Sequence, residues 1–239
     1  MKTVVAIDGP AASGKSTTAR LVAQELGYVH LDTGAMYRVV TFACLEKQLP
    51  PKESPEMVNL LLSMEIRFQS VGRGWQRTWY NERDVTETIR SQEVSQKVSA
   101  YSALPTIRSR MVKLQRQIGA EHNVVCEGRD IGTLVFPDAQ FKFYLTADLE
   151  VRAKRRHEEL LARGSDSSLE RIIEELQQRD REDSTRELSP LHKAEDAIVV
   201  DTTDLAIPAQ VDYIVATIMD KLKHPDRKSI NKEKQAQNE

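Results

Sequence analysis

A glycine-containing segment near the start of the chain constrains the fold more than any other feature. Residues 9–16 read Gly-Pro-Ala-Ala-Ser-Gly-Lys-Ser, which fits the phosphate-binding loop pattern G-x-x-x-x-G-K-[ST]. The apolar run at 3–7 predicts a buried strand before this loop, and apolar residues at helical spacing over 17–26 predict a helix after it. Strand, loop and helix together favour this interpretation over an ordinary βα turn that happens to contain glycine.

The loop has the chemistry of a site for a nucleoside triphosphate. Its glycines let successive backbone N–H groups point at one anion, and the N-terminus of the following helix adds partial positive charge. Lys15 can reach the outer phosphates, and the hydroxyl of Ser16 can bind Mg²⁺. The motif alone does not indicate which reaction follows.

Composition excludes several other classes of protein. The 239 residues suffice for one α/β domain with an insertion, and the net charge of −2 favours neither nucleic acid nor an anionic membrane as a partner. The longest apolar runs have the length of strands, and the first strand begins too early for a signal peptide. Cys44 and Cys126 form no metal-binding pattern and are expected to be reduced core residues. We therefore expect a cytoplasmic protein.

Short apolar or β-branched segments predict the strands of one parallel sheet. These segments are residues 3–7, 28–32, 124–127, 141–145 and 197–201. Helical patterns separate them, which is typical of a parallel sheet covered by helices on both faces. In such sheets ligands bind beyond the carboxyl ends of the strands. The polar residues that follow each strand are therefore the candidate site.

The connection between the second and third of these strands is much longer than an ordinary crossover. A helical pattern over 37–46 ends at a break around Pro50 and Pro51. Strand-like stretches follow at 66–68, 78–80 and 84–85, with a hairpin turn predicted at 72–74. This pattern predicts a small antiparallel insertion in the α/β core.

Two helices are predicted to complete this connection, near 87–103 and 106–119, with Pro105 between them. Trp75 and Trp79 lie in the predicted hairpin. Either they pack the small sheet, or they offer aromatic surfaces on which bases could stack.

Three polar clusters carry the candidate chemistry. Segment 32–38, DTGAMYR, follows the second strand and contains Thr33 as a candidate helix cap, with Arg38 one turn later; alternatively Arg38 is a surface residue. Segment 127–133, EGRDIGT, places acids and an arginine at the end of a strand, where buried charges need partners or ligands. Segment 179–186, RDREDSTR, is either a solvated helix end or a set of guanidinium groups that bind phosphate.

A helical pattern over 150–178 is interrupted near 164–168 and carries a basic cluster before the interruption. The cluster consists of Arg152, Lys154, Arg155, Arg156 and Arg163. It is either a solvated helix face or a mobile arm that closes over the triphosphate.

At these residues the chain resembles the bacterial cytidylate kinases of the nucleoside monophosphate kinase family. The matching stretches follow the family's order over residues 1–222: IDGPAASGKST at 7–17, DTGAMYR at 32–38, PxIR at 105–108, EGRDIGT at 127–133, RAKRR at 152–156 and RDREDSxR at 179–186. The phosphate loop is common to many families, whereas its combination with DTGAMYR and GRDIGT is very specific.

The resemblance implies an α/β, P-loop NTPase-like fold with a five-stranded parallel sheet of order 2-3-1-4-5, flanked by helices. Within one kinase domain at 1–222, it implies a core at 1–59 and 104–222, an antiparallel NMP-binding insertion at about 60–103 and a short lid at about 152–168. The polar tail at 223–239 is expected to be disordered.

The resemblance also implies residue roles. Those for ATP are Gly9, Pro10, Ala11, Ala12, Ser13, Gly14, Lys15, Ser16 and Thr17 of the loop, with Arg152 and Arg156 of the lid. Those for CMP are Arg38, Arg129 and Arg186 at the phosphate, Thr33, Ser99, Arg108 and Asp130 around the cytosine, and Arg179 and Asp183 at the ribose. The catalytic set is Lys15, Arg38, Arg129 and Arg186. Ser16 is the implied Mg²⁺ ligand, with Glu127 contacting the metal through water; Glu127 stands where Asp is expected in many members.

The implied reaction is in-line phosphoryl transfer from ATP to CMP, and also to dCMP, by a monomeric enzyme that needs Mg²⁺ and binds neither membrane nor nucleic acid. One alternative is a kinase of another small acceptor, such as a different nucleoside monophosphate, shikimate or gluconate. The insertion and the Arg108/Asp130 pair favour an acceptor that bears a base. A GTPase switch would carry N-K-x-D, and the chain has only NKEK at 231–234. An RNA-binding module would use the basic stretch 152–163, and its binding would depend on salt.

Overall fold

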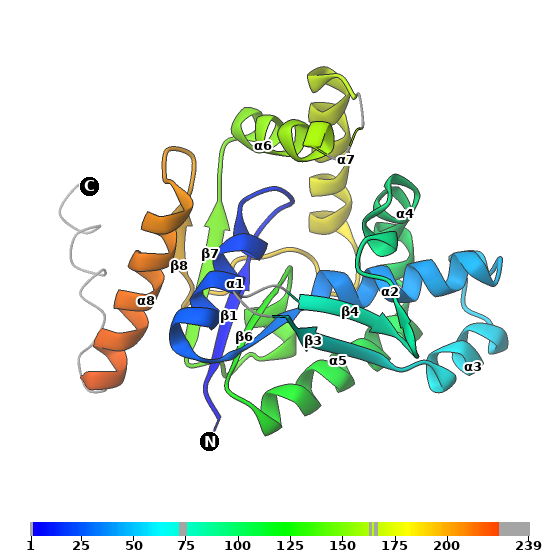
Figure 1. Ribbon diagram of the computed structural model, residues 1–239, viewed down its shortest axis with the longest axis horizontal. Helices are drawn as coiled ribbons and strands as arrows, with labels where there is room; N and C mark the ends of the chain where they lie inside the picture. Colours follow the sequence, from blue (N-terminus) through cyan, green and yellow to red (C-terminus); the bar gives the residue numbers. More distant parts are fainter. Residues whose placement is uncertain (1, 72–75, 163, 165–166, 225–239) are drawn as a thin grey trace.

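The computed structural model describes residues 2–71, 76–162, 164 and 167–224 (Figure 1). The predicted hairpin turn at 72–74, together with Trp75, Arg163 and most of the predicted tail, lies outside these residues. Among the described helices, none is long and apolar enough to span a lipid bilayer.

The core is the predicted five-stranded parallel sheet. Its strands are β1 (Val4–Asp8), β2 (Val29–Asp32), β6 (Val124–Gly128), β7 (Phe141–Thr146) and β8 (Ile198–Asp201). Their order is β2-β6-β1-β7-β8, which confirms the implied 2-3-1-4-5 order. Each predicted strand differs from the observed one by about a residue at an end. The interior strand β1 is buried along its whole length, as a strand covered on both faces should be.

The register of the sheet brings three acidic residues to one edge. Asp8 at the end of β1 pairs with Gly128 of β6, and Asp32 at the end of β2 pairs with Glu127. All the strands run in the same direction, so their carboxyl ends share this edge. The polar segments predicted to form the site therefore start side by side.

Helices cover both faces of the sheet (Figure 1). On one face, α1 (Lys15–Leu26) and α8 (Ile207–Lys223) share a buried apolar cluster with β1 and β7. On the other face, α2 (Thr33–Glu46), α4 (Gln92–Ser102) and α5 (Pro105–Glu121) contribute to a larger cluster that contains Ala6 and Leu31 of the sheet. Cys44 and Cys126 are buried free thiols, as predicted.

The long connection contains the predicted antiparallel sheet, with strands β3 (Ile66–Ser70), β4 (Gln76–Tyr80) and β5 (Arg83–Asp84). A short 3₁₀ turn, η1 (Thr88–Arg90), precedes α4. The connection also holds a helix that the sequence analysis missed, α3 (Pro55–Ser63), which begins after the capping side chain of Ser54. The indole of described Trp79 donates a hydrogen bond to Gln69 of the neighbouring strand, an arrangement that fits packing of the small sheet.

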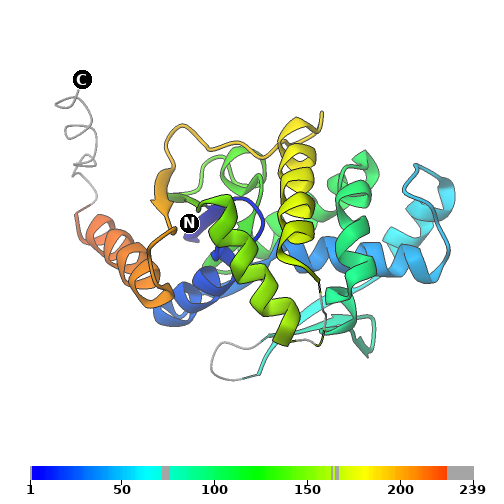
Figure 2. The same ribbon diagram turned by 90° about the horizontal axis from the view of Figure 1, so that it is seen from above.

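The two helices beyond β7 differ little from the prediction. They are α6 (Leu149–Ala162) and α7 (Leu169–Thr185), so α7 runs farther than predicted and includes most of the cluster at 179–186. Figure 2 shows α7 between α6 and α4. A single π-helical turn, η2 (Ile131–Val135), follows β6 and was not predicted.

Candidate active site

One cleft of about 610 Å³ joins the phosphate loop to the arginine-rich end of α7. Its lining includes most of the residues singled out from the sequence: Ala11, Ala12, Gly14, Lys15, Ser16, Thr17, Thr33, Arg38, Ser99, Arg108, Glu127, Arg129, Asp130, Arg156, Arg179, Asp183 and Arg186. Gly9, Pro10, Ser13 and Arg152 lie outside the lining. The three polar clusters of the sequence thus meet in one place.

The loop folds tightly around the N-terminus of α1. Gly9 has a φ of 154°, and a Cβ there would lie 2.1 Å from the carbonyl oxygen of Leu145. Gly14 has a φ of 86° and is the N-cap of α1, so the free N–H groups of the first helical turn point into the cleft mouth. These positions explain why glycine is required at both ends of the motif.

Lys15 is buried although it carries the charge of the loop. Its Nζ donates to the carbonyl oxygen of Pro10 at 2.9 Å, and only 8% of the residue is exposed. Burial lowers the pKa of Lys15 to about 7, and the positive charge of Arg129 acts in the same direction. The ammonium group therefore lacks the anionic partner that a phosphate would provide.

Two oxygen atoms at the edge of the sheet fit the needs of a magnesium ion. The hydroxyl of Ser16 donates to Oε2 of Glu127 at 2.5 Å, and Glu127 is almost fully buried. Hydroxyl and carboxylate oxygens are the ligands that Mg²⁺ prefers, and the ion usually keeps several waters and phosphate oxygens as its other ligands. No group of three or more His, Cys, Asp or Glu side chains in the described part of the chain could hold a metal alone. The donor set thus suits Mg²⁺ that arrives with a nucleotide.

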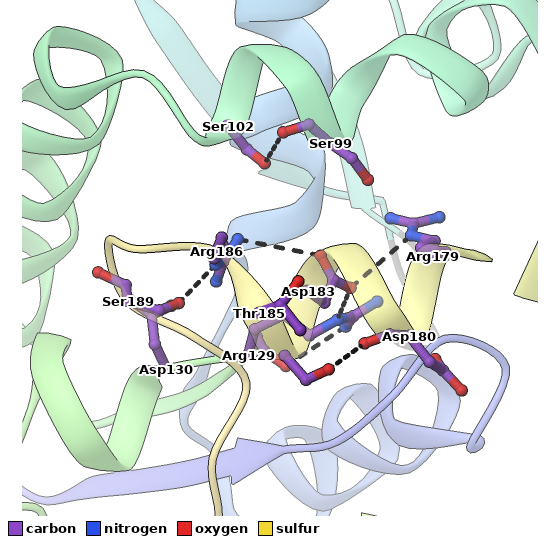
Figure 3. Close-up of polar contacts among 12 residues, drawn as sticks. Ser99, Ser102, Arg129, Asp130, Arg179, Asp180, Asp183, Thr185, Arg186 and Ser189 are labelled. Carbon is purple, nitrogen blue, oxygen red and sulfur yellow. Dashed lines mark hydrogen bonds and ion pairs between the residues drawn. The ribbon is translucent and has the colours of Figure 1, made fainter. Parts of the chain in front are cut away.

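Three arginines converge on Asp183 of α7: Arg179 of the same helix, Arg186 directly after it, and Arg129 of the segment after β6 (Figure 3). Nε of Arg129 donates to Asp183 at 2.7 Å, and Arg179 and Arg186 each lie 3.9 Å from the same carboxylate. Burial alone would raise the pKa of Asp183, but the charges of Arg129 and Arg179 keep it below its ordinary value. The carboxylate is therefore ionised at neutral pH.

Positive charge remains in excess around Asp183. Burial and the neighbouring Arg129 lower the pKa of Arg179 to about 9, and burial also lowers the pKa of Arg38. The buried Nε of Arg38 has no hydrogen-bond partner among the described residues. Several guanidinium groups thus face one carboxylate, an arrangement that calls for a bound anion such as phosphate.

The far end of the cleft is polar and fixed. Nη2 of Arg108 donates to Asp130, and both residues are buried. Nη1 of Arg108 also donates to the carbonyl oxygen of Ser102, and its guanidinium lies 5.6 Å from the ring of Tyr37. Ser99 lies one helical turn before Ser102 on α4 (Figure 3). Such a set of fixed donors and acceptors beside an aromatic ring can hold a planar, polar group.

The basic cluster of α6 splits into different environments. Arg152 is buried. Its Nη1 donates to the carbonyl oxygen of Ala11 at 3.2 Å and forms an ion pair with Asp180 of α7 at 2.8 Å. Arg155 donates to the carbonyl oxygen of Thr202. Arg156 lines the cleft and pairs with Glu159. Arg152 therefore joins the phosphate loop to α7, and a simple solvated face does not describe this cluster.

The predicted cap of α2 was wrong. Asp32, not Thr33, is the N-cap, because its carboxylate accepts the backbone N–H of Ala35 at 2.8 Å. Thr33 is the first residue of the helix, and its hydroxyl donates to the carbonyl oxygen of Glu127 at 2.7 Å. The register of β2 against β6 puts that carbonyl within reach, a long-range contact that local capping rules do not include.

Sequence reasoning also missed Asp8, which positions the turn that carries Arg129 and Asp130. Its carboxylate accepts the backbone N–H groups of Ile131 and Gly132, each at 2.8 Å. Burial raises the pKa of Asp8 to about 6, although these hydrogen bonds act in the opposite direction. The signal was available, since Asp8 directly follows a buried strand.

Ser189 was missed as well and orients two of the implied CMP-binding arginines. Its hydroxyl accepts from Nε of Arg108 at 3.0 Å, and its carbonyl oxygen accepts from Nε of Arg186 at 2.5 Å. Its φ of 53° is unusual for a residue with a side chain. No local pattern marks this position in the sequence.

Comparisons with known proteins agree with this geometry. A family model described as cytidylate kinase matches residues 5–223. A cytidylate kinase of Carboxydothermus hydrogenoformans is 49% identical over 216 residues, which cover 90% of this chain and 95% of the relative. A cytidylate kinase of Bacillus subtilis is 45% identical over 220 residues, covering 92% and 98%. The crystal structure of an uncharacterized protein from Eubacterium ventriosum aligns with a TM-score of 0.51 at 12% identity over 91% of this chain and 98% of that one, a likeness of fold alone.

Proposed function

The chain belongs to the cytidylate kinase family and phosphorylates CMP with ATP, and we propose that it does so by direct in-line transfer between the two ends of its cleft. The resemblance inferred from the motifs is thereby confirmed, and an acceptor such as shikimate or gluconate is not favoured. The observation that carries the mechanism is the single cleft that holds the phosphate loop, the arginines around Asp183 and the Arg108–Asp130 pair.

At the donor end, the phosphate loop binds ATP through its backbone N–H groups and Lys15. Lys15 is already folded against the loop and exchanges its contact with Pro10 for a phosphate oxygen. Ser16 would bind Mg²⁺ directly and Glu127 would contact it through water, and the metal would supply positive charge that offsets the charge of the phosphates. The contact of Arg152 with the loop backbone at Ala11 supports its assignment to the ATP side.

At the acceptor end, Arg38, Arg129 and Arg186 grip the phosphate of CMP. The phosphate of CMP is then the anion that balances the excess positive charge around Asp183. Arg179 and Asp183 contact the ribose, and we propose that dCMP is accepted as well. Monomeric state and cytoplasmic location stay predictions from the sequence.

The transfer needs positioning and charge neutralisation more than proton chemistry. An oxygen of the CMP phosphate is already ionised near neutral pH, so no general base is required. The arginines and Lys15 stabilise the negative charge of the transferred group, and the fixed cleft aligns donor and acceptor. Closure of the lid and the insertion over the cleft excludes water, which would otherwise accept the phosphoryl group.

Base selection rests on Asp130 and Arg108. Cytosine offers an amino donor at N4 and acceptors at N3 and O2, which match a carboxylate and a guanidinium. Uracil would present a carbonyl to the carboxylate, so a charged hydrogen bond would be lost at a cost of about 1.5–3 kcal/mol. The contact with Arg108 fixes the orientation of the Asp130 carboxylate, which allows it to discriminate between cytosine and uracil.

The test is a panel of acceptors, CMP, dCMP, UMP and AMP, each assayed with ATP by release of ADP. We expect kcat/KM for CMP to exceed that for UMP by about tenfold or more. Asp130→Asn can offer uracil a donor, and we expect it to narrow the CMP:UMP ratio mainly by lowering the CMP value.

Equal use of UMP or AMP by the parent enzyme would contradict the assignment of the base site. An equal fall for every acceptor in Asp130→Asn would show instead that Asp130 has a structural role in orienting Arg108. A matched control is Asp138→Asn, a change at an exposed carboxyl outside the cleft lining.

A further inference from the structure

His30 forms a contact that neither the motifs nor the proposed mechanism uses. Its Nε2 lies 3.0 Å from Oε1 of Glu127, whose other oxygen, Oε2, accepts the hydroxyl of Ser16. The three side chains thus form a continuous chain from the edge strand β2 through β6 to the phosphate loop. Glu127 is the residue at which this sequence departs from the Asp expected in many members of the family.

Strand register explains why the pair can form. His30 lies opposite Val125, and Asp32 lies opposite Glu127, so His30 and Glu127 are one diagonal step apart on neighbouring parallel strands. A glutamate side chain is long enough to reach back along the strand to the imidazole, while an aspartate is one methylene shorter. The carbonyl oxygen of His30 accepts from Nε2 of Gln76 in β4, which ties this point of the edge strand to the insertion.

The direction of the hydrogen bond follows from the state of the carboxyl group. The carboxyl group of Glu127 accepts the hydroxyl of Ser16 through Oε2 and approaches Nε2 of His30 through Oε1. An ionised carboxylate only accepts, so Nε2–H of His30 is the donor. The Nδ1 atom of His30 is buried and has no hydrogen-bond partner in the described part of the chain, and a lone pair there is less costly than an unpaired N–H.

We propose that His30 is a positioning residue that fixes the carboxylate of Glu127 toward Ser16 and thereby strengthens the binding of the nucleotide's metal ion. This inference rests on the proposed function, since it assumes that Ser16 and Glu127 face Mg²⁺. Without His30, the longer and more flexible Glu127 would turn among several rotamers, including ones directed at Lys15. Outer partners of this kind commonly change metal affinity by 10–100-fold.

The test measures how Mg²⁺ changes the binding of ADP, by calorimetry with Mg²⁺ and with a chelator. Metal coupling is the dissociation constant of ADP in chelator divided by that in Mg²⁺, and its measurement needs no turnover. We expect His30→Leu to lower this ratio by about tenfold, while the affinity for ADP in chelator changes by less than about twofold. His30→Gln keeps a donor near Oε1, and we expect it to retain most of the coupling.

Glu127→Asp supplies the matched background, because the shorter carboxylate cannot reach His30. We expect His30→Leu to change the metal coupling in the parent but not in Glu127→Asp, so that the two substitutions are not additive. A nitrogen-correlated proton spectrum of the parent should show the imidazole of His30 as the Nε2–H form.

An unchanged coupling ratio in a folded His30→Leu variant would overturn the proposal, as would an equal loss in the Glu127→Asp background. Absence of metal coupling in the parent itself would instead count against the metal site of the proposed function. If His30→Leu fails to fold, the comparison of His30→Gln with the parent still decides: a loss of coupling as large as tenfold in that variant contradicts a role carried by the donor.

Discussion

Lys15 is an example of a residue whose side chain is already positioned in the site before a ligand binds. Its Nζ is satisfied by its own loop at Pro10, and burial brings its pKa to about 7. A phosphate bound beside it favours the charged form and raises that pKa again. Nucleotide binding above neutral pH should therefore be coupled to uptake of a proton by the enzyme.

We expect the parent enzyme at pH 8 to take up close to one more proton on binding ADP than Lys15→Met does. The physical reason is that a group with a pKa of about 7 is mostly neutral at pH 8 in the free protein. Calorimetry in buffers of different ionisation enthalpy measures the uptake, and the variant corrects for titration of the nucleotide. As pH rises above 7, ADP affinity should weaken in the parent and stay flatter in Lys15→Met. Equal proton uptake by both proteins would contradict the shift.

Sequence patterns were enough to place the motif residues in the cleft. They did not identify every residue that orients the side chains of the cleft. Motifs mark Lys15, Ser16, Arg129 and Asp130, and a parallel topology brings the strand ends together. Their position in one cleft could therefore be predicted from the sequence. Ser189 carries no such mark, since its role depends on a loop that returns from α7 to Arg108. The roles of these residues toward substrate stay predictions that mutation must test.

At the level of elements, α7 matters because one of its carboxylates contacts guanidinium groups of the helix itself, of the segment after it and of the segment after β6. Asp183 accepts from Arg129 and lies near Arg179 and Arg186. Its backbone carbonyl also accepts from Leu191, which anchors the returning chain. The C-terminal half of this helix is thus held in place by charge more than by apolar packing.

We expect Asp183→Asn to lower the free energy of unfolding of the ligand-free protein by about 3–5 kcal/mol, because buried arginines lose their counter-charge. The pKa of Asp183 lies below its ordinary value, so its ionised form adds stability above the unfolded pKa and loses it as pH falls through the folded one. The difference between parent and variant should be complete at neutral pH and shrink below about pH 4. Urea titrations across this range measure it.

Glu174→Gln is the matched control, an exposed carboxylate on the same helix. Addition of sulfate should restore more stability to Asp183→Asn than to the parent, since the anion replaces the missing charge. A loss of stability that is the same at pH 3 and pH 7 would show that packing, not charge, is the cause.

Elements formed by local interactions could be predicted from the sequence, whereas those that depend on contacts between distant residues could not. Strand β1 and helix α1 were predictable from apolar runs and spacing, and α3 could have been, because Ser54 and Pro55 are ordinary start signals. The π-helical turn η2 could not, because it depends on Asp8, more than a hundred residues away in the chain. The turn begins directly after Asp130, which contacts Arg108, so the least predictable element lies next to the proposed base site.

At the scale of the whole molecule, the insertion shares the larger of the apolar clusters that pack against the central sheet. Val85, Ile89 and Val98 of the inserted segment belong to the same buried cluster as Ala6 and Leu31 of the central sheet. The boundaries expected for the insertion, at about 60–103, therefore mark a change in topology without a separate core. Since the apolar contacts are continuous, insertion and sheet should unfold together.

We expect Ile89→Ala to lower the free energy of unfolding of the entire chain by about 2–5 kcal/mol, because Ile89 is fully buried where the insertion meets α2. Both tryptophans, Trp75 and Trp79, lie in the insertion, so their fluorescence reports on it while far-UV circular dichroism reports mainly on the helices of the core. Urea transitions followed by the two signals should coincide in the parent and shift together in the variant. Leu62→Ala, at a side chain that is 69% exposed, should move neither. A fluorescence transition that precedes the dichroism transition would show that the insertion unfolds by itself, which a shared core does not permit.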